Sequence, residues 1–508
     1  MILATPPRVR FAPSPTGPLH MGGVRTALYN YLFAKQNKGT FILRLEDTDQ
    51  NRFVEGAENY ILEALRWCGI FPDEGFSIGG DYGPYKQSER KEFYLSKVAW
   101  LLENNKAYYA FDKPTALEAL REQTQLKGEN FTYGPLNREH LDNSLRLSPL
   151  ELSLRLEAKE PYVVRFKVPL RKNFTFFDRI KGKIQVDTQW LDDKILLKSD
   201  GMPTYHLANV VDDYAMKISH VIRGEEWLSS LPLHFLLYEA FEWKAPEFIH
   251  LPLILNDKGA GKLSKRHAQK QNFSIFPLTW EDPLLKHISI GYKEAGYLPE
   301  SFLNILALLG WNPGNEKEIF SLKELVNTFS LERISKSGAR FNLEKAIWIN
   351  QQHLQLKSID FFKESLEKEL IKKQLPYQKE KLERIINEIK PRLRFINDLF
   401  LETSYFFLPP RVYEKGAKIT PQTLGSLKEI REDFLSMNED SFKQDKLKEK
   451  IKEYALIKKL PLINLMQALR ISLVGNLKGV DLFFILEMLG KKQSIYRIDA
   501  FLKDGYVN

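Results

Sequence analysis

The 508-residue sequence contains a single cysteine, Cys68. One thiol excludes an intramolecular disulfide and any zinc site that needs several thiolates, and it suits a reducing compartment. Long apolar runs are also missing, since "FLNILALLGW" and "VDLFFILEMLG" fall short of the ~20 residues that span a membrane. No apolar signal segment precedes the first expected strand. We therefore expect a cytoplasmic protein with no membrane partner.

Two common nucleotide-binding loops are absent as well. No G-x-G-x-x-G follows a predicted strand. Near "NDKGAGKLSKR", Asn256 stands where a Walker A loop needs its first glycine, and Leu263 stands where it needs Ser or Thr. These departures exclude the dinucleotide-binding and P-loop interpretations.

The excess of positive over negative charge lies entirely in the last third of the chain. Residues 331–508 contain 33 Lys and Arg against 24 Asp and Glu, whereas residues 1–330 contain 41 of each kind. A basic, helix-rich end beside a neutral front suggests that the end holds a polyanion. Solvated helix faces would explain the charge equally well.

The order of expected elements indicates an α/β fold with a parallel sheet. "RVRFAP" and "TFILRLED" are predicted strands, and the helix "MGGVRTALYNYLFAKQNKG" between them is expected to close at Gly39. The next helix, "VEGAENYILEALRWCG", places five residues on one apolar face: Ala57, Ile61, Ala64, Leu65 and Cys68.

From about residue 86 the pattern changes to the helix "KEFYLSKVAWLLENNK", a polar stretch, and an expected strand pair, "YVVRFKVP" with "GKIQVDT". The sheet pattern resumes at "DKILLKSDGMPTYHLANVVDDY", where Ser199-Asp200-Gly201 predicts a hairpin turn. The strand "SHVIRGEEW" and the helix "SSLPLHFLLYEAFEW" follow. We therefore expect one nucleotide-binding sheet split by an inserted domain, with helices dominating after Asp257.

The stretch "RFAPSPTGPLHMGG" joins the first strand to the first helix. A helix N-terminus at this place presents unpaired N–H groups to a phosphate. Its three glycines, Gly17, Gly22 and Gly23, allow close approach of a ligand, and its prolines hold the loop rigid. His20 adds a donor that can reach a phosphate. The loop is typical of a nucleoside triphosphate site.

The stretch "KLSKR" gathers three cations in five residues, Lys262, Lys265 and Arg266. Such a cluster suits a dense negative charge such as a departing pyrophosphate. A solvated basic loop is the simpler alternative for this stretch taken alone.

These two stretches together resemble the HIGH and KMSKS signatures of class I aminoacyl-tRNA synthetases. In order, "RFAPSPTGPLHMGGVRTAL", "RLEDTD", "GMPTYHLANVVDD", "VIRGEEW" and "KLSKR" resemble the bacterial glutamyl-tRNA synthetases. The resemblance runs from Arg8 to about residue 350. It implies ATP-dependent activation of glutamate to glutamyl-adenylate, with pyrophosphate released, and transfer of the glutamyl group to the terminal adenosine of tRNA-Glu.

The resemblance also implies roles for individual residues. The implied catalytic residues are His20, Lys262, Ser264 and Lys265. The implied ATP site adds Gly17, Gly22, Gly23 and Glu226. The implied glutamate site consists of Arg10, Ala12, Ser14, Glu46, Tyr205, Asn209 and Arg223, with Arg223 assigned to the side-chain carboxylate because arginine forks suit carboxylates. Trp227 is placed near the tRNA end.

An ordinary helix N-cap is an equal alternative for Asp47 and Asp49. The sequence also departs from the family twice. Many relatives bind zinc in the insertion through cysteines and a histidine, whereas "YYAFDKPTAL" has neither, so we expect no zinc and only the Mg²⁺ that accompanies ATP. Gly23 stands where the class-wide signature has a second histidine, although the glutamyl branch commonly varies there.

The implied fold is a Rossmann-like catalytic domain (residues 1–85 and 196–256) split by an inserted α+β acceptor-stem-binding domain (86–195). A stem-contact domain with the KLSKR loop (257–335) and an α-helical anticodon-binding region (336–508) follow. The protein is expected to be a monomer.

Four alternatives differ in substrate or in activity. A non-discriminating form would also charge tRNA-Gln, and a silent relative would only bind tRNA. Arg10 and Arg223 disfavour a glutaminyl enzyme. The long helical C-terminal region disfavours the shorter enzyme that glutamylates a modified base in tRNA-Asp.

Overall fold

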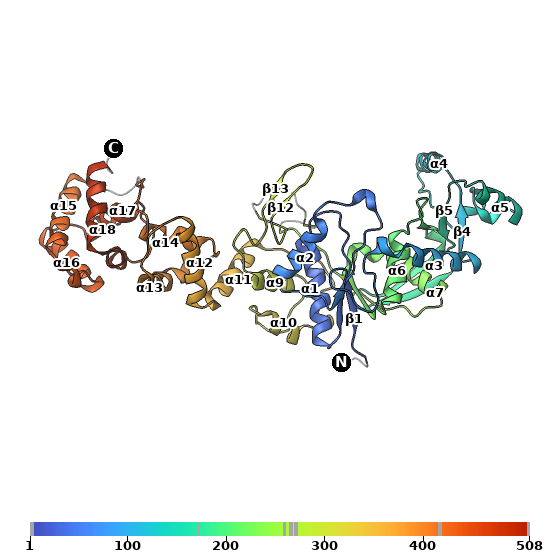
Figure 1. The fold of residues 1–508 in the computed structure, drawn as a ribbon, viewed down its shortest axis with the longest axis horizontal. Coiled ribbons are helices and arrows are strands. Elements are labelled where there is room, and N and C mark those ends of the chain that lie inside the picture. Colours follow the sequence, from blue (N-terminus) through green and yellow to red (C-terminus); the bar gives the residue numbers. More distant parts are fainter. Residues whose placement is uncertain are drawn as a thin grey trace. The chain divides into compact units, whose positions relative to one another are not determined.

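The computed structural model describes residues 5–170, 172–257, 261–263, 268, 273–414 and 419–504. The chain divides into two compact units, Met1–Glu294 with Pro299–Ile349, and Ala295–Leu298 with Asn350–Asn508. Every strand of the described residues belongs to the first unit, and the second is built from helices (Figure 1). The expected α/β front and helical back are confirmed.

The first unit opens with the predicted β-α-β-α order. Strands β1 (Arg8–Phe11) and β2 (Thr40–Leu43) pair in parallel on either side of helix α1 (Met21–Gln36), and helix α2 (Ala57–Trp67) leads to β3 (Glu74–Gly75). The expected apolar face of α2, including Cys68, is buried. Its 3.6-residue pattern therefore identified the packed face correctly.

The end of α1 differs from the expectation in one residue. The left-handed turn falls on Lys38 (φ 53°), not on Gly39. Gly39 is required for another reason, since a Cβ built there would lie 2.1 Å from the carbonyl oxygen of Pro7. The close approach of the two chain segments, rather than positive φ, explains this glycine.

The second half of the sheet adjoins β1. Strand β9 (His220–Gly224) pairs in parallel with β10 (Glu247–Leu251), and the Ser219 amide that precedes β9 donates to the Arg8 carbonyl at 2.9 Å. Helices α6 (Tyr205–Ala215) and α7 (Leu231–Ala240) supply buried apolar side chains to this part of the core. The carboxyl ends of β1 and β9 thus lie at one edge, where open α/β sheets bind ligands.

The segment between the two halves forms a separate antiparallel sheet. Strands β4 (Ala107–Ala110), β5 (Val163–Phe166) and β8 (Ile195–Leu197) make up this sheet, in the order β4-β5-β8. The helices of the segment are α3 (Lys91–Glu103), α4 (Pro114–Leu126) and α5 (Pro149–Glu157). The strand in "DKILL" belongs to this sheet, so the expectation that it resumes the parallel sheet is wrong.

The expected strand pair in this segment is also wrong. "GKIQVDT" forms β7 (Gly182–Asp187), which pairs with β6 (Asn173–Asp178) rather than with β5. Strand β6 in turn pairs in parallel with β10 of the main sheet, through Phe248 and Asp178. Alternation of side chains identifies strands but not their partners, so the sequence could not distinguish the two pairings.

The remainder of the first unit packs beside α1. Strands β11 (Ile254–Leu255) and β14 (Ala339–Arg340) pair in parallel, and β12 (Trp280–Glu281) forms a short hairpin with β13 (Ile288–Ser289). Helix α9 (Pro299–Leu308) accepts a hydrogen bond from Tyr29 of α1 at the Ala307 carbonyl, at 2.9 Å. Helix α10 (Leu322–Thr328) belongs to the unit's C-terminal part, and the unit ends at Ile349 within helix α11 (Leu343–Leu356).

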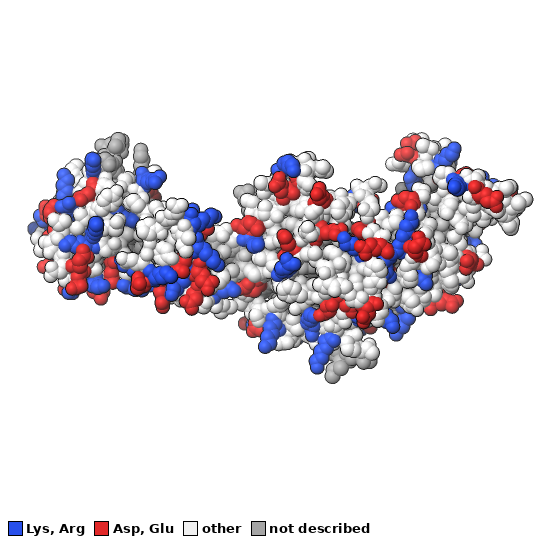
Figure 2. All heavy atoms as spheres, in the orientation of Figure 1, with Lys and Arg blue, Asp and Glu red and all other residues white. Residues whose placement is uncertain are grey.

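The second unit is a packed set of helices around one apolar core. Its helices are α12 (Ile359–Lys372), α13 (Lys379–Ile389), α14 (Asp398–Thr403), α15 (Pro421–Ser436), α16 (Gln444–Ile457), α17 (Leu462–Val474) and α18 (Leu482–Asp504), which is broken at Gly490. Tyr405, Phe406 and Phe407 pack against the core. On the face shown in Figure 2, charges of both signs are interspersed over this unit. Within the described ranges, no helix is long and apolar enough to cross a membrane.

Candidate active site

A cavity of about 630 Å³ lies where β1 and β9 end and α1 begins. Every residue to which the sequence analysis assigned a role lines it, except Ser264 and Lys265, which lie outside the described residues. The lining residues with predicted roles are Arg10, Ala12, Ser14, Gly17, His20, Gly22, Gly23, Glu46, Tyr205, Asn209, Arg223, Glu226, Trp227 and Lys262. We call His20, Glu226 and Lys262 the loop group, and Arg10, Glu46, Asn209 and Arg223 the arginine group.

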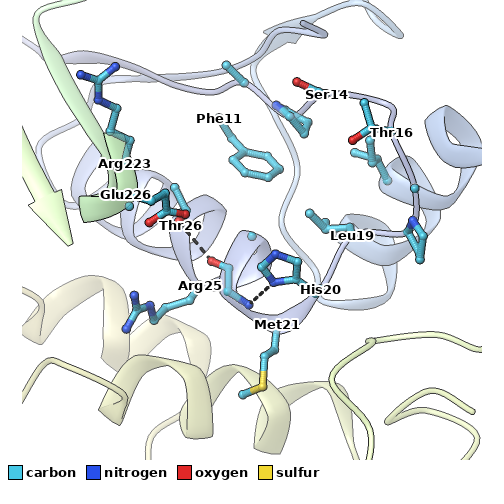
Figure 3. Close-up of a pocket in the computed structure, with 18 of the residues that line it drawn as sticks. Phe11, Ser14, Thr16, Leu19, His20, Met21, Arg25, Thr26, Arg223 and Glu226 are labelled. Carbon is cyan, nitrogen blue, oxygen red and sulfur yellow. Dashed lines mark hydrogen bonds between the residues drawn. The ribbon is translucent and has the colours of Figure 1, made fainter. Parts of the chain in front are cut away.

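His20 is the N-cap of α1. Its Nδ1 accepts a hydrogen bond from the Gly22 amide at 3.0 Å (Figure 3). An acceptor Nδ1 places the proton of the neutral ring on Nε2, which becomes a donor. The cap therefore fixes both the orientation and the tautomer of the ring.

The glycines after His20 pack closely against side chains of the same loop. A Cβ at Gly22 would lie 2.8 Å from the His20 ring, and one at Gly23 would lie 2.4 Å from Leu19. Gly17 has φ 144° with no atom within 4 Å of a built Cβ, so backbone conformation explains it. The expected reason for these glycines is close approach of a ligand, whereas the structure shows contacts within the loop for Gly22 and Gly23.

The His20 side chain is exposed to the open cavity, yet its surroundings disfavour a charged ring. Desolvation by the cavity walls lowers the pKa of His20, and the cations Lys262 and Arg25 lower it further, while Glu226 opposes them. The ring is therefore neutral near pH 7, in agreement with an acceptor Nδ1.

Backbone pairing with the segment Ile254–Leu255 places Lys262 beside the cavity. It forms a bridge with Leu255, and the next amide, of Leu263, donates to the Ile254 carbonyl at 2.8 Å. The Lys262 Nζ lies 3.9 Å from Glu226 Oε1, with both side chains about half exposed. Such an exposed pair is weak and can yield to a stronger anion.

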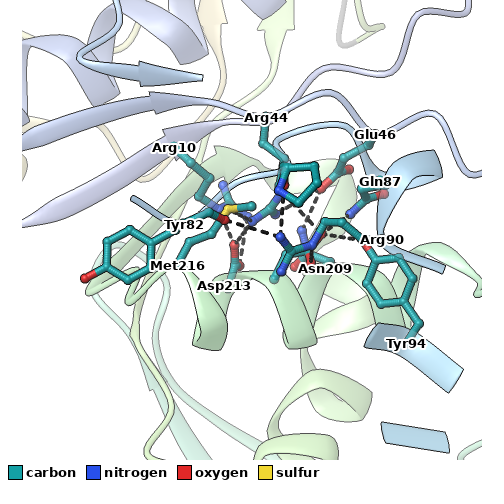
Figure 4. A network of polar contacts seen from close by, with 12 residues as sticks. Arg10, Arg44, Glu46, Tyr82, Gln87, Arg90, Tyr94, Asn209, Asp213 and Met216 are labelled. Carbon is teal, nitrogen blue, oxygen red and sulfur yellow. Dashed lines mark hydrogen bonds and ion pairs between the residues drawn. The ribbon is translucent and has the colours of Figure 1, made fainter. Parts of the chain in front are cut away.

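Arg10 and Glu46 are held by a buried ionic network (Figure 4). Asp213 of α6 accepts from Arg10 Nε at 2.9 Å and Nη2 at 3.2 Å, and from Arg44 Nη1 at 2.7 Å. Glu46 Oε1 accepts from Arg44 and from Asn209, both at 3.1 Å. These side chains are almost completely buried. Because every charge has an opposite partner, the network can exist in the core.

A second carboxylate extends this network away from the cavity. Asp212 accepts from Arg90 at 2.8 Å, from Tyr94 at 2.8 Å and from Gln87 at 2.9 Å. Arg44 Nε lies 3.9 Å from the same carboxylate. The network therefore joins β2, α6 and the start of α3.

Arg223 of β9 is anchored through most of its donors. Its Nε donates to His250 Nε2 at 3.0 Å, and Nη1 donates to the Tyr205 hydroxyl at 3.0 Å. The Nη1 atom also lies 3.4 Å from His234 Nδ1, and Nη2 lies 3.4 Å from the Trp227 carbonyl. The guanidinium is thus oriented before any ligand binds.

Several residues of the site were not predicted from the sequence. Arg25 lines the cavity and is buried, with its Nη1 donating to the Leu309 carbonyl at 2.8 Å. Asp213 and Arg44 support the arginine group, and His250 supports Arg223. Arg44 directly precedes "LED", and Asp213 ends "ANVVDD", so both stood inside the quoted motifs, but only the fold shows which side chains they contact.

The two carboxylates with an open interpretation differ in their contacts. Asp47 binds the amide and hydroxyl of Ser88, at 2.8 and 2.6 Å, at the start of a 3₁₀ turn before α3. Asp49 makes no side-chain capping bond to the 3₁₀ turn that follows it. Asp47 therefore has a structural partner. Within the described ranges, no group of three or more His, Cys, Asp or Glu is arranged to hold a metal ion.

Comparisons with known proteins agree with this fold. The family of class I tRNA synthetases (E and Q), catalytic domain, matches residues 7–348, and the family of anticodon binding domains matches residues 364–502. The fold and the cavity therefore define a class I tRNA synthetase.

Curated relatives and solved structures are more specific. The chain is 50% identical to a glutamate–tRNA ligase of Christiangramia forsetii, over 97% of each chain, and 48% identical to one of Amoebophilus asiaticus, over 98% of each. A crystal structure of a glutamate tRNA ligase from Elizabethkingia meningosepticum, in complex with its amino acid, superimposes with a TM-score of 0.94 at 48% identity, covering 98% of this chain and 100% of that one. The chain belongs to the glutamate–tRNA ligase family.

Proposed function

We propose that this chain activates L-glutamate with ATP and transfers the glutamyl group to tRNA-Glu. The observation that carries this proposal is that one cavity is lined by the proline–glycine loop, Lys262 and the buried Arg223. In the first step, a carboxylate oxygen of glutamate attacks the α-phosphorus of ATP, and the bond to the bridging oxygen breaks to release pyrophosphate. In the second step, a ribose hydroxyl of the terminal adenosine attacks the activated carbonyl carbon, and AMP leaves.

The loop group would bind ATP, which enters as its Mg²⁺ complex. The N-terminus of α1 offers backbone donors and a positive dipole end to the phosphates. His20 Nε2 would donate to a phosphate oxygen, and Lys262, Ser264 and Lys265 would stabilise the charge on departing pyrophosphate. Positioning and charge are sufficient for this chemistry without a covalent protein nucleophile.

The arginine group would bind glutamate. Arg223 takes the side-chain carboxylate. Arg10 holds Asp213 with Nε and Nη2, which among the described residues leaves Nη1 for a substrate carboxylate. Both hydrogen bonds to Glu46 end on Oε1, so Oε2 would accept from the substrate ammonium. A glutamine side chain would leave the buried positive charge of Arg223 unpaired, so binding of glutamine is disfavoured.

We assign tRNA to the remaining parts of the chain. Residues 86–195 would hold the acceptor end near Trp227, residues 257–335 the adjoining stem, and residues 336–508 the anticodon, with 1–85 and 196–256 as the two catalytic halves. Unstacked anticodon bases are recognised by stacking and edge hydrogen bonds. We place the enzyme in the cytoplasm as a monomer.

Aminoacylation tests the proposal directly. Purified tRNA-Glu and tRNA-Gln are each offered labelled glutamate or glutamine with ATP and Mg²⁺. Glutamate on tRNA-Glu alone indicates a discriminating enzyme, and glutamate on both tRNAs indicates a non-discriminating one. Glutamine on either tRNA, or no charging, contradicts the proposal. Lys265→Ala separates a catalyst from a silent tRNA-binding relative, since it should abolish charging and leave tRNA binding intact.

A further inference from the structure

Three adjacent strands place Asp178, His250 and Arg223 in a row. Arg223 on β9 lies directly opposite His250 on β10, and Asp178 ends β6, which pairs with β10 at Phe248, two residues before His250. Residues two apart on a strand face the same side, so the three side chains meet on one face of the sheet. All three are almost fully buried.

The hydrogen bonds between these side chains run in one direction. His250 Nδ1 lies 2.8 Å from Asp178 Oδ2, and His250 Nε2 accepts from Arg223 Nε at 3.0 Å. Since Arg223 can only donate, Nε2 carries the lone pair and Nδ1 carries the proton that Asp178 accepts. Asp178 Oδ1 is held by the amides of Ile180 and Lys181, at 2.9 and 2.8 Å. The carboxylate is thus fixed, the carboxylate fixes the ring, and the ring holds Arg223 at Nε.

We infer that Asp178 and His250 are positioning residues that set the orientation in which Arg223 binds the side-chain carboxylate of glutamate. A guanidinium grips a carboxylate either through Nε and Nη2 or through Nη1 and Nη2. His250 occupies Nε, so only the Nη1 and Nη2 edge remains for a bidentate grip. The near partners of these two nitrogens, the Tyr205 hydroxyl on Nη1 and the Trp227 carbonyl on Nη2, belong to residues that line the cavity. Nη1 has a second, longer contact with His234 Nδ1, at 3.4 Å.

This inference rests on the proposed role of Arg223 and extends it to the strand β6. A fixed edge presents two donors and therefore selects a carboxylate with its two acceptor oxygens, because the NH₂ group of the glutamine amide would face a donor. A mobile guanidinium could avoid this clash by binding the amide oxygen alone. The Asp178–His250 pair therefore supports both the affinity for glutamate and the rejection of glutamine.

His250→Leu and His250→Gln test the inference in aminoacylation of tRNA-Glu. Leu removes the acceptor for Arg223, and we expect the KM for glutamate to rise about tenfold to a hundredfold, with the preference for glutamate over glutamine reduced. The KM for ATP should stay within about twofold, because the loop group is unchanged. Gln can present an oxygen near the place of Nε2, so it should restore most of the affinity.

His220→Leu is the matched control. His220 is a buried histidine on the same strand pair, opposite Glu247 at the other end, and it does not line the cavity. It should leave the KM for glutamate unchanged, and thermal unfolding measures the cost of losing a buried imidazole. Two results for His250→Leu would overturn the inference. One is an equal rise in the KM for glutamate and the KM for ATP, and the other is a lower melting temperature with an unchanged KM for glutamate.

Arg223→Lys separates this inference from the proposed function. If Arg223→Lys leaves the KM for glutamate unchanged, the assigned role of Arg223 fails. If it raises this KM while His250→Leu does not, only the positioning role fails. If both raise it, the double variant should show less than the sum of the two effects, because both changes act on one guanidinium.

Discussion

The two groups of residues that line the cavity are built in opposite ways. In the arginine group, Arg10, Glu46, Asn209 and Arg223 are at most 8% exposed and hydrogen-bonded to one another or to buried partners. In the loop group, the side chains of Lys262 and Glu226 are 55% and 46% exposed, and their contact is long. The first arrangement is fixed before a ligand arrives, which suits selection of one amino acid. The second leaves charge available, which suits a triphosphate that brings its own charge and metal.

The largest expected effect comes from breaking the network under the arginine group. Asp213→Asn removes the charge that Arg10 and Arg44 share, and two buried cations then lose their main partner. We expect a loss of about 3–5 kcal/mol in the free energy of unfolding, measured by urea denaturation. Glu239→Gln, which breaks an exposed pair with Lys172, is the control and should cost less than about 1 kcal/mol. Equal effects would show that the buried network contributes no more to stability than an exposed ion pair.

His20→Asn should affect the rate more than the stability. Asn is a good N-cap and can accept from the Gly22 amide in place of Nδ1, but it lacks the outer donor. We expect kcat for glutamate activation to fall by about 10²–10³-fold, as for the loss of one donor to a developing charge. The melting temperature should barely change. Full activity in His20→Asn would show that His20 acts only as a helix cap.

Acid should lower the stability of the fold because burial keeps His206 and His234 in their neutral form. Burial lowers the pKa of His206 to about 4, helped by Lys194 and Arg223, and burial also lowers the pKa of His234. In the unfolded chain both groups titrate near 6.5, so the unfolded state binds more protons below that pH and stability falls between about pH 6.5 and 4. His206→Gln should reduce this fall in melting temperature. An unchanged slope would show that His206 is not involved.

The smallest expected effect concerns the coupling of Lys262 to His20. Lys262 is one of the cations that lower the pKa of His20. Lys262→Gln should therefore move the acidic limb of the profile of kcat/KM against pH to higher pH, while Lys262→Arg should leave it in place. Because the lysine is half exposed, the shift should shrink at high salt. If the acidic limb does not move in Lys262→Gln, it reflects the titration of a group other than His20.

The sequence predicted local elements well where a pattern repeats along a single segment. The helix α2 and its buried face from Ala57 to Cys68 followed from 3.6-residue spacing, and the strands β1, β2 and β9 followed from short apolar runs. The pairing of β7 with β6, and of β6 with β10, did not follow, because alternation contains no information about a strand's partner. The contact of Gly39 with Pro7 was likewise invisible, since it depends on how closely two segments pass.

For the site, the sequence by itself indicated the proline–glycine loop with His20 and the basic loop as features of a triphosphate site, because such loops act within a few residues of chain. The resemblance to a known family indicated the role of the arginine in "VIRGEEW". Only the tertiary structure decided that Asp213 joins Arg10 to Arg44, and that Asp178 and His250 reach Arg223. Buried charges require partners, and the fold supplies those partners from strands and helices that lie far apart in the sequence.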